Sequence, residues 1–91
     1  MAFVEVVRLL ETRRGVILDQ LVGNVLEAVP RYELLSGVEL RESLDGLVDA
    51  LLHLLKSGDR AAVRERLTQN AERRVAQGFT AADYLRAVFV I

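Results

Sequence analysis

His53 is the only histidine of the chain, so a catalytic dyad or a histidine metal site has no second member. It follows Asp49 by four residues on the polar side of an expected helix, and we interpret it as a solvent-facing side chain with a carboxylate neighbour. The acidic residues near the N-terminus are scattered rather than paired, and no Glu-x-x-His pattern occurs. The chain also lacks cysteine. We therefore expect no metal and no enzymatic activity.

The six glycines never gather into a phosphate-binding loop, so no nucleotide cofactor is expected. The formal charge of −1 comes from interspersed charges, which argues against a dedicated nucleic-acid or anionic-membrane surface. No uncharged run approaches the roughly 18 to 20 residues that span a bilayer. Glu5 and Arg8 interrupt the start of the chain, which does not resemble a signal peptide. We expect a cytoplasmic protein without membrane insertion and without nucleic acid.

Asn70 and Arg74 carry the sharpest chemical hypothesis. Helical geometry sets Arg74 near the buried edge of its helix, one turn after Asn70. A partly buried arginine beside an asparagine could receive a carboxylate ligand or an acidic side chain from a partner. Alternatively, Arg74 lays its methylenes over Leu67 and pairs with a nearby acid such as Asp83. The sequence leaves both interpretations of Arg74 open.

These side chains are positioned by a stretch in which one helix must end and another must begin, residues 72–83. Gly78 is the residue type expected just past a helix C-terminus, because a left-handed backbone costs glycine little. Thr80 followed by Asp83 has the spacing of an N-terminal capping arrangement. Phe79 lies between the two signals, and we expect it to turn inward and fix the angle between the helices.

Apolar residues from 3 to 28 fit one long N-terminal helix, because they recur at spacings of three and four. Glycine weakens this helix, and a break near Arg14-Gly15 would divide it into two. Further apolar residues give it a second face, which can serve a second protomer, unless the helix is simply buried on most sides. For this interface we choose Val4, Val6, Leu9, Arg13, Val16 and Val90.

The remaining chain predicts a connecting segment and three helices. Pro30 ends the first helix, and Tyr32 and Leu35 of the connection are expected to tuck against the bundle. Ser36 and Glu39 predict a capping box for a helix ending at 57–58, whose core face is Leu40, Leu44, Leu47, Val48, Leu51 and Leu55. Helices over 60–77 and 81–91 follow. The predicted fold is all-α, a small antiparallel bundle of four helices, or five if the first is broken.

We expect residues 1–91 to form a single domain, because a chain of this length supports one core. The sequence ends on Val-Phe-Val-Ile without a polar cap. This indicates the first part of a longer protein, in which the last helix continues toward a downstream domain.

Several segments together resemble the RsbRD-type N-terminal domain, found in bacterial RsbT co-antagonist proteins and at the front of some kinases and transcription regulators. The sharpest is the Arg-x-x-x-Gln-Gly-Phe-Thr junction of residues 73–80, and the others are residues 30–32, 35–41, 51–59 and 84–87. The resemblance covers nearly the whole chain. It implies a helical, sensor-like or dimerising input module before an output domain, and it offers no catalytic residues to carry over.

We therefore expect a non-catalytic sensory and homodimerisation module of a bacterial signalling protein, with a signalling partner. A docking platform for an unrelated protein and a sensor for a small apolar ligand are the alternatives within binding. A helix-turn-helix DNA reader over residues 76–86 is a further alternative. It lacks a basic footprint, because Arg86 would be the only basic residue of the recognition helix.

Overall fold

The computed structural model describes the backbone of residues 2–90 and the side chains of residues 4–90. Within that range the chain is helical throughout, with short connections and no strand. The elements are α1 (Ala2–Thr12), α2 (Arg14–Ala28), the 3-10 helix η1 (Pro30–Leu34), α3 (Gly37–Ser57), α4 (Ala61–Ala76) and α5 (Ala81–Phe89). The predicted all-α bundle is confirmed, in its five-helix form.

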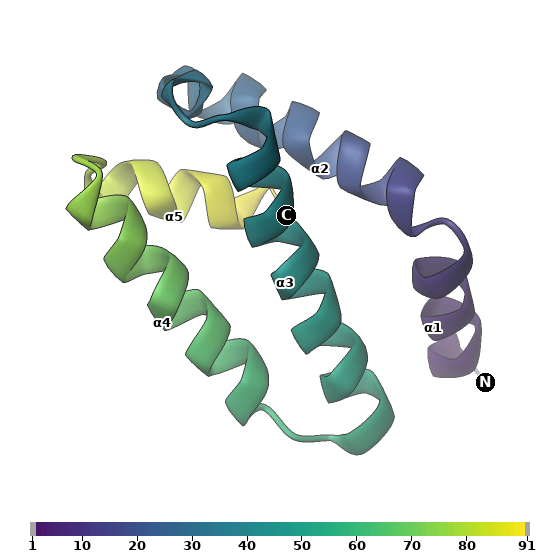
Figure 1. Cartoon of the computed structure of the whole chain (residues 1–91). Coiled ribbons are helices and arrows are strands. Elements are labelled where there is room, and N and C mark those ends of the chain that lie inside the picture. Colours follow the sequence, from purple (N-terminus) through teal and green to yellow (C-terminus); the bar gives the residue numbers. More distant parts are fainter. Residues whose placement is uncertain (1, 91) are drawn as a thin grey trace.

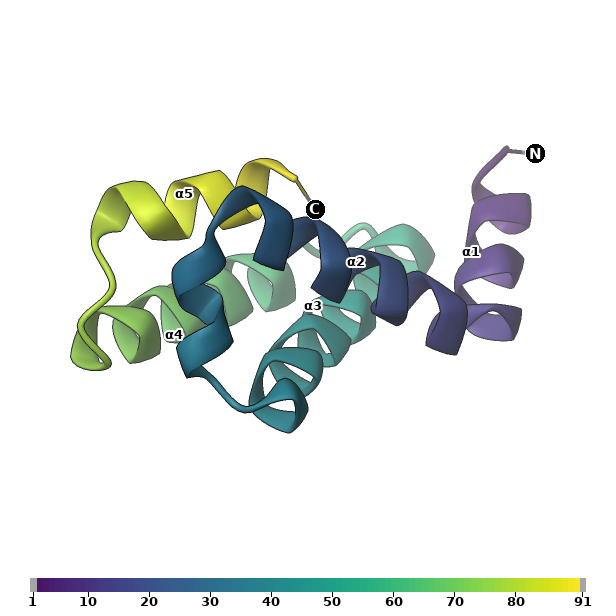
Figure 2. The ribbon, with the colours of Figure 1, turned by 90° about the horizontal axis from the view of Figure 1, so that it is seen from above.

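Helix α3 is the central element (Figure 1), and α1, α2 and α4 all pack against it. Helix α5 bridges α2 and α4. Seen from above (Figure 2), α1 lies at one end of the molecule and α4 and α5 lie at the other. The longest dimension of the domain is 41 Å. A surface on α1 is therefore well separated from the junction of α4 and α5.

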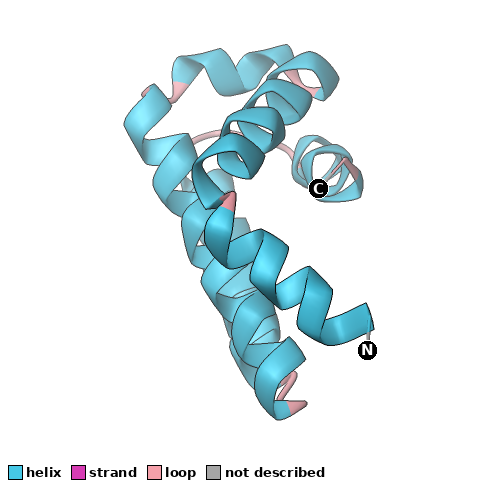
Figure 3. Ribbon diagram, turned by 90° about the vertical axis from the view of Figure 1, so that its right-hand side faces the viewer, coloured by secondary structure: helices cyan, strands magenta, loops and turns pink. Residues whose placement is uncertain are grey.

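The long N-terminal helix expected from the sequence is divided in two at Arg13, one residue before the predicted break (Figure 3). Arg13 leaves the helical region, with φ −117° and ψ 24°. The Thr12 hydroxyl donates to the carbonyl of Arg8 at 2.8 Å, a bond that bends helices. A straight helix over 2–28 would be about 40 Å long at roughly 1.5 Å per residue, longer than α3 at about 32 Å. With the break, both halves contact α3.

The core is built on α3 by an apolar stripe that repeats every fourth residue: Leu40, Leu44, Val48 and Leu52. The expected stripe included Leu51, which is instead exposed, and gave Leu52 only a flanking position. Four residues of helix correspond to a rotation of about 400°, roughly 40° more than a full turn, so a stripe at every fourth residue turns gradually around this long helix. Val25, Val29, Tyr32 and Phe79 complete the centre of the core.

The junction between α4 and α5 has the predicted construction. Gly78 adopts a left-handed backbone with φ 92°, and Phe79 is buried with its ring 4.6 Å from that of Tyr32. The Thr80 hydroxyl accepts a hydrogen bond from the Asp83 amide, and the Asp83 carboxylate accepts one from the Thr80 amide. This capping box begins α5 immediately after the turn.

Candidate functional site

The interface residues chosen from the sequence are mostly exposed. Val6 and Leu9 on α1 have exposed fractions of 43% and 50%, and Val16 on α2 has 51%. Arg13, at the break between the two helices, is exposed as well. Two other apolar side chains of α1, Val7 and Leu10, pack against the core. Helix α1 therefore presents apolar side chains on two sides, one toward the bundle and one toward solvent.

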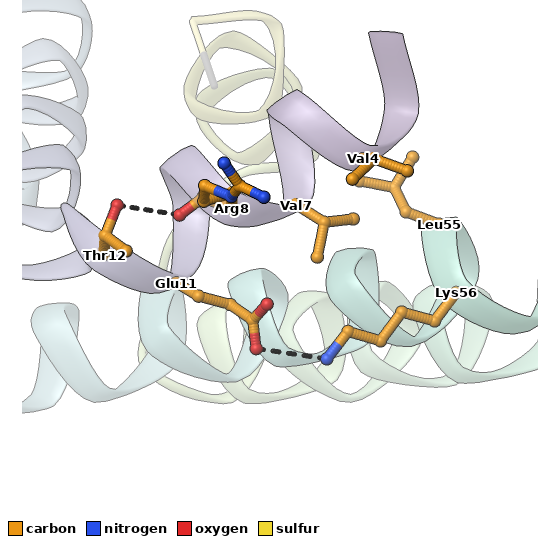
Figure 4. A pocket seen from close by; sticks show the side chains of 7 residues that line it. All are labelled: Val4, Val7, Arg8, Glu11, Thr12, Leu55 and Lys56. Atoms are coloured by element: carbon orange, nitrogen blue, oxygen red, sulfur yellow. Dashed lines mark hydrogen bonds and ion pairs between the residues drawn. The ribbon is translucent and has the colours of Figure 1, made fainter. Parts of the chain in front are cut away.

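Val4 lies on a different side of α1, about 200° around the helix from Val6 at 3.6 residues per turn. It lines an open groove of about 360 Å³ between α1 and the end of α3, with Val7 and Leu55 beside it (Figure 4). The rim is bridged by the Lys56 ammonium, which donates to the Glu11 carboxylate at 3.1 Å. The chosen set is therefore divided between an outer face and a groove.

Val90 follows α5 and is half-buried against the core cluster. The structure thus gives Val90 a packing contact, unlike the exposed residues of α1. Other large apolar side chains that the sequence reasoning did not select are exposed, including Leu34 on η1 and Leu85 and Phe89 on α5. Leu85 and Phe89 were missed because the short last helix contains too few apolar repeats to distinguish its buried face from its exposed face.

Asn70 and Arg74 are almost completely buried, with exposed fractions of 4% and 2%. Arg74 donates to the side-chain oxygens of Gln77 and Ser43, each at 2.6 Å, and to the Glu39 carboxylate at 3.4 Å. The expected acid partner, Asp83, is not among these groups. Asp83 instead caps α5 and pairs with Arg31 at 3.4 Å, because the turn at 77–80 points it toward η1.

Glu39 takes part both in the start of α3, through its backbone amide, and in the contact with α4, through its carboxylate. Its amide donates to the Ser36 hydroxyl at 3.0 Å, as expected for the start of α3, but its carboxylate turns to α4 and accepts from Gln77 at 2.6 Å. The expected capping box is therefore only half formed. Sequence reasoning missed Glu39, Ser43 and Gln77 as partners of Arg74. Their helical spacing was the available signal, since Glu39 and Ser43 are four residues apart and Arg74 and Gln77 three.

Two tyrosines border Arg74, of which Tyr32 is fully buried and Tyr84 is half-buried. Burial raises the pKa of the Tyr32 hydroxyl and that of the Tyr84 hydroxyl, and the nearby positive charge of Arg74 offsets part of each shift. Both phenols are therefore neutral at physiological pH. The Arg74 guanidinium also lies over the Tyr32 ring, 5.9 Å from its centroid. The Tyr84 hydroxyl donates to the carbonyl of Leu67 at 2.8 Å.

His53 is exposed, as expected, but its nearest carboxylate is that of Asp59 at 3.4 Å. Asp49 instead accepts a hydrogen bond from Arg14. The pKa of Asp59 is lowered by the Ala61 amide and then by His53. Among the side chains that the structure describes, no three acidic or histidine residues gather in a way that could hold a metal ion. No helix in the described part of the chain is long and apolar enough to cross a membrane.

The comparison that decides the family covers most of this architecture. The family model of the RsbT co-antagonist protein RsbRD N-terminal domain matches residues 15–91. The chain belongs to the RsbRD N-terminal domain family. This places it among regulatory domains of stress-response signalling. No curated protein and no solved structure matches the chain.

The RsbRD match begins at Gly15, inside α2. It includes the junction at 73–80 and the buried Arg74 cluster, and it leaves out α1. The exposed apolar side chains of α1 therefore lie on a helix that precedes the matched domain.

Proposed function

We propose that this RsbRD-type domain is a non-catalytic sensory and homodimerisation module, and that the outer face of α1 binds a second copy. The observation that carries the proposal is the pair Val6 and Leu9, which are three residues apart on α1 and about half exposed. Val16, near the start of α2, is a further exposed apolar side chain close to the break. Adjacent exposed apolar side chains of this kind are typical of protein–protein contacts.

Two further features support this choice of surface. Helix α1 lies at the end of the molecule opposite α4 and α5, so a contact there leaves the other elements accessible (Figures 1 and 2). Helix α1 also packs directly on α3, to which α4 is joined by the buried Arg74 cluster. In the proposal, a change in helix packing passes along α3 and α4 and leaves through α5 toward a downstream output domain.

The test is the oligomeric state of the purified domain, measured by light scattering over a dilution series from high to low micromolar. We expect a dimer that Val6→Glu or Leu9→Glu disrupts without loss of the helical circular dichroism signal. Leu34→Glu is the matched control, because Leu34 is even more exposed but lies on η1, and this variant should remain dimeric. A wild-type chain that is monomeric at every concentration would contradict the proposal.

A second candidate is a docking platform for an unrelated protein, favoured by the groove of Val4, Val7 and Leu55 between α1 and α3. If the domain is a monomer that binds another protein, and Leu55→Glu abolishes that binding, docking through this groove would be favoured over self-association. The DNA-reader alternative has less support, since Arg86 is the only basic side chain of α5.

A further inference from the structure

A small cavity of about 30 Å³ lies in the core, where η1, α3, α4 and α5 meet. Most of its wall is apolar, but five of the side chains around it are polar: Tyr32, Ser43, Asn70, Arg74 and Tyr84. Three of these residues, Tyr32, Asn70 and Arg74, are at least 96% buried. The domain therefore contains a compact polar site in a half-open pocket among the apolar side chains of the core.

The Tyr32 hydroxyl is the unusual member of this group. It is buried, and no described residue offers it a hydrogen-bond partner. Buried hydroxyls nearly always have a partner, from protein or from bound water, because an unpaired one destabilises the fold. The neighbouring Tyr84 hydroxyl shows the usual outcome, since it donates to the Leu67 carbonyl. The unpaired Tyr32 hydroxyl therefore indicates that a hydrogen-bonding partner is bound beside it.

The charges around the cavity decide what kind of molecule fits. The positive charge of Arg74 is already faced by the Glu39 carboxylate, and its guanidinium also bonds to Ser43 and Gln77. An additional anion is therefore not required. The remaining groups, a phenol and the Asn70 carboxamide, call for a small neutral molecule that can both accept and donate.

We propose that one water molecule is bound in this cavity, accepting a hydrogen bond from Tyr32 and bonding to Asn70. The cavity volume of about 30 Å³ exceeds the roughly 10 to 15 Å³ that a single water needs. A bound water also needs two to four polar partners. Such a water joins η1 to α4 through the core. Because α1 contributes no side chain to the cavity, this inference is independent of the proposed dimer.

The first test is thermal unfolding of the whole chain carrying Tyr32→Phe, with Tyr84→Phe as the matched control. Each change removes one phenol hydroxyl and leaves the ring in place. If the Tyr32 hydroxyl is bound by water, both variants should lower Tm, by about 4 to 8 °C for the loss of one hydrogen bond in a domain of this size. An unchanged or higher Tm for Tyr32→Phe, beside a lower one for Tyr84→Phe, would overturn the proposal.

The second test is a high-resolution crystal structure of the wild-type chain and of Tyr32→Phe. We expect a solvent peak within hydrogen-bonding distance of the Tyr32 hydroxyl and of the Asn70 side chain in the wild type, and its loss in the variant. A cavity without such a peak in the wild type would overturn the proposal directly.

A separate observation concerns how two α1 helices would meet. Glu5 and Leu9 are exposed and lie four residues apart on one side of α1. Arg13 is also exposed, follows Leu9 by four residues directly after the end of α1, and still donates its amide to the Leu9 carbonyl. Neither Glu5 nor Arg13 forms an ion pair with another described residue. An acidic side chain thus lies four residues before an exposed leucine, and a basic side chain lies four residues after it.

From this symmetry we infer that two copies pair their α1 helices antiparallel, with Leu9 at the two-fold axis. In that arrangement Glu5 of each copy faces Arg13 of the other, so the surface is complementary to itself. The partner is a second copy of this chain, and the inference rests on the proposed homodimer.

The test is charge reversal, read out as the dimer dissociation constant. Glu5→Arg and Arg13→Glu should each weaken the dimer by roughly 3- to 30-fold, because two exposed pairs per dimer become repulsive. The double variant should restore most of the affinity.

A double variant no better than the single ones, with Leu9→Glu still disruptive, would overturn the antiparallel register and leave the dimer intact. A wild-type monomer would overturn both. The two failures are therefore distinguishable.

Discussion

Arg74 on α4 donates a hydrogen bond to the hydroxyl of Ser43 on α3 at 2.6 Å, and both residues are buried. A charged group in this position must have its donors paired, because burial of an unpaired charge is costly. Glu39 and Gln77 provide the other partners. The pair therefore fixes how α4 lies against the N-terminal half of α3.

Arg74→Ala should lower the free energy of unfolding by about 3 kcal/mol, since it removes a buried guanidinium and leaves its partners unpaired. Urea denaturation measures this loss. Arg73→Ala is the control, because Arg73 is exposed on the same helix and should change stability by no more than about 0.5 kcal/mol. An Arg74→Ala domain as stable as the control would refute the structural role. A stable variant that lost partner binding would instead support a binding role for Asn70 and Arg74.

Gly23→Ala should stabilise the domain by about 0.5 to 1 kcal/mol. Gly23 lies inside α2, and an added Cβ would meet nothing within 4 Å, so the gain in helix propensity is not offset by a clash. Thermal unfolding gives the comparison. Gly78→Ala is the contrasting variant and should destabilise by about 1 to 2 kcal/mol, because φ at Gly78 is 92°. Equal effects of the two substitutions would contradict this account.

Stability should fall as the pH rises above about 10. The pKa of Tyr32 and that of Tyr84 are raised by burial from the usual value of 10.0, so the unfolded chain releases these protons first. The folded state then holds more protons than the unfolded state, and stability decreases with pH until the folded pKa is passed. Urea midpoints between pH 8 and 11 measure the slope. The Tyr32→Phe, Tyr84→Phe double variant should lose most of it, and an unchanged slope would assign it to other groups.

Arg14→Ala should lower stability by about 1 kcal/mol. The Arg14 guanidinium lies 2.6 Å from the Asp45 carboxylate and 2.7 Å from that of Asp49, but both acids are partly solvated, which limits the gain. Arg64→Ala, an exposed substitution on α4, serves as the control in urea denaturation. If the two variants lost the same small amount, solvent screening would account for the whole interaction of Arg14.

Local signals were the best predictors of this fold. Gly78, Thr80 and Asp83 were assigned correctly because a helix cap depends on residues within one turn of it. The break at Arg13 was placed one residue late, at Arg14, whose side chain is held by α3 residues 31 and 35 positions further along the chain. Sequence spacing within one helix carries no information about such distant partners.

The same reason explains what was missed around Arg74. The helical pattern predicted Arg74 only near the buried edge of its helix, and the full burial of Arg74 and Asn70 was not predicted. Glu39 lies 35 residues away from Arg74, while Asp83 is the nearer acid in sequence. The α1 residues chosen for an interface are exposed, whereas Val90 packs against the core. Their role as a contact between copies stays a prediction.

The break at Arg13 interrupts the helical geometry but not its hydrogen bonds. The Arg13 amide still donates to Leu9 at 2.9 Å, and its carbonyl still accepts from Ile17 at 3.0 Å. A small change of angle at this point therefore costs little in backbone hydrogen bonding. If two copies meet through α1, the break and the packing of Val7 and Leu10 together join the shared contact to each domain, so a change of angle at Arg13 would have to shift α1 on α3 as well.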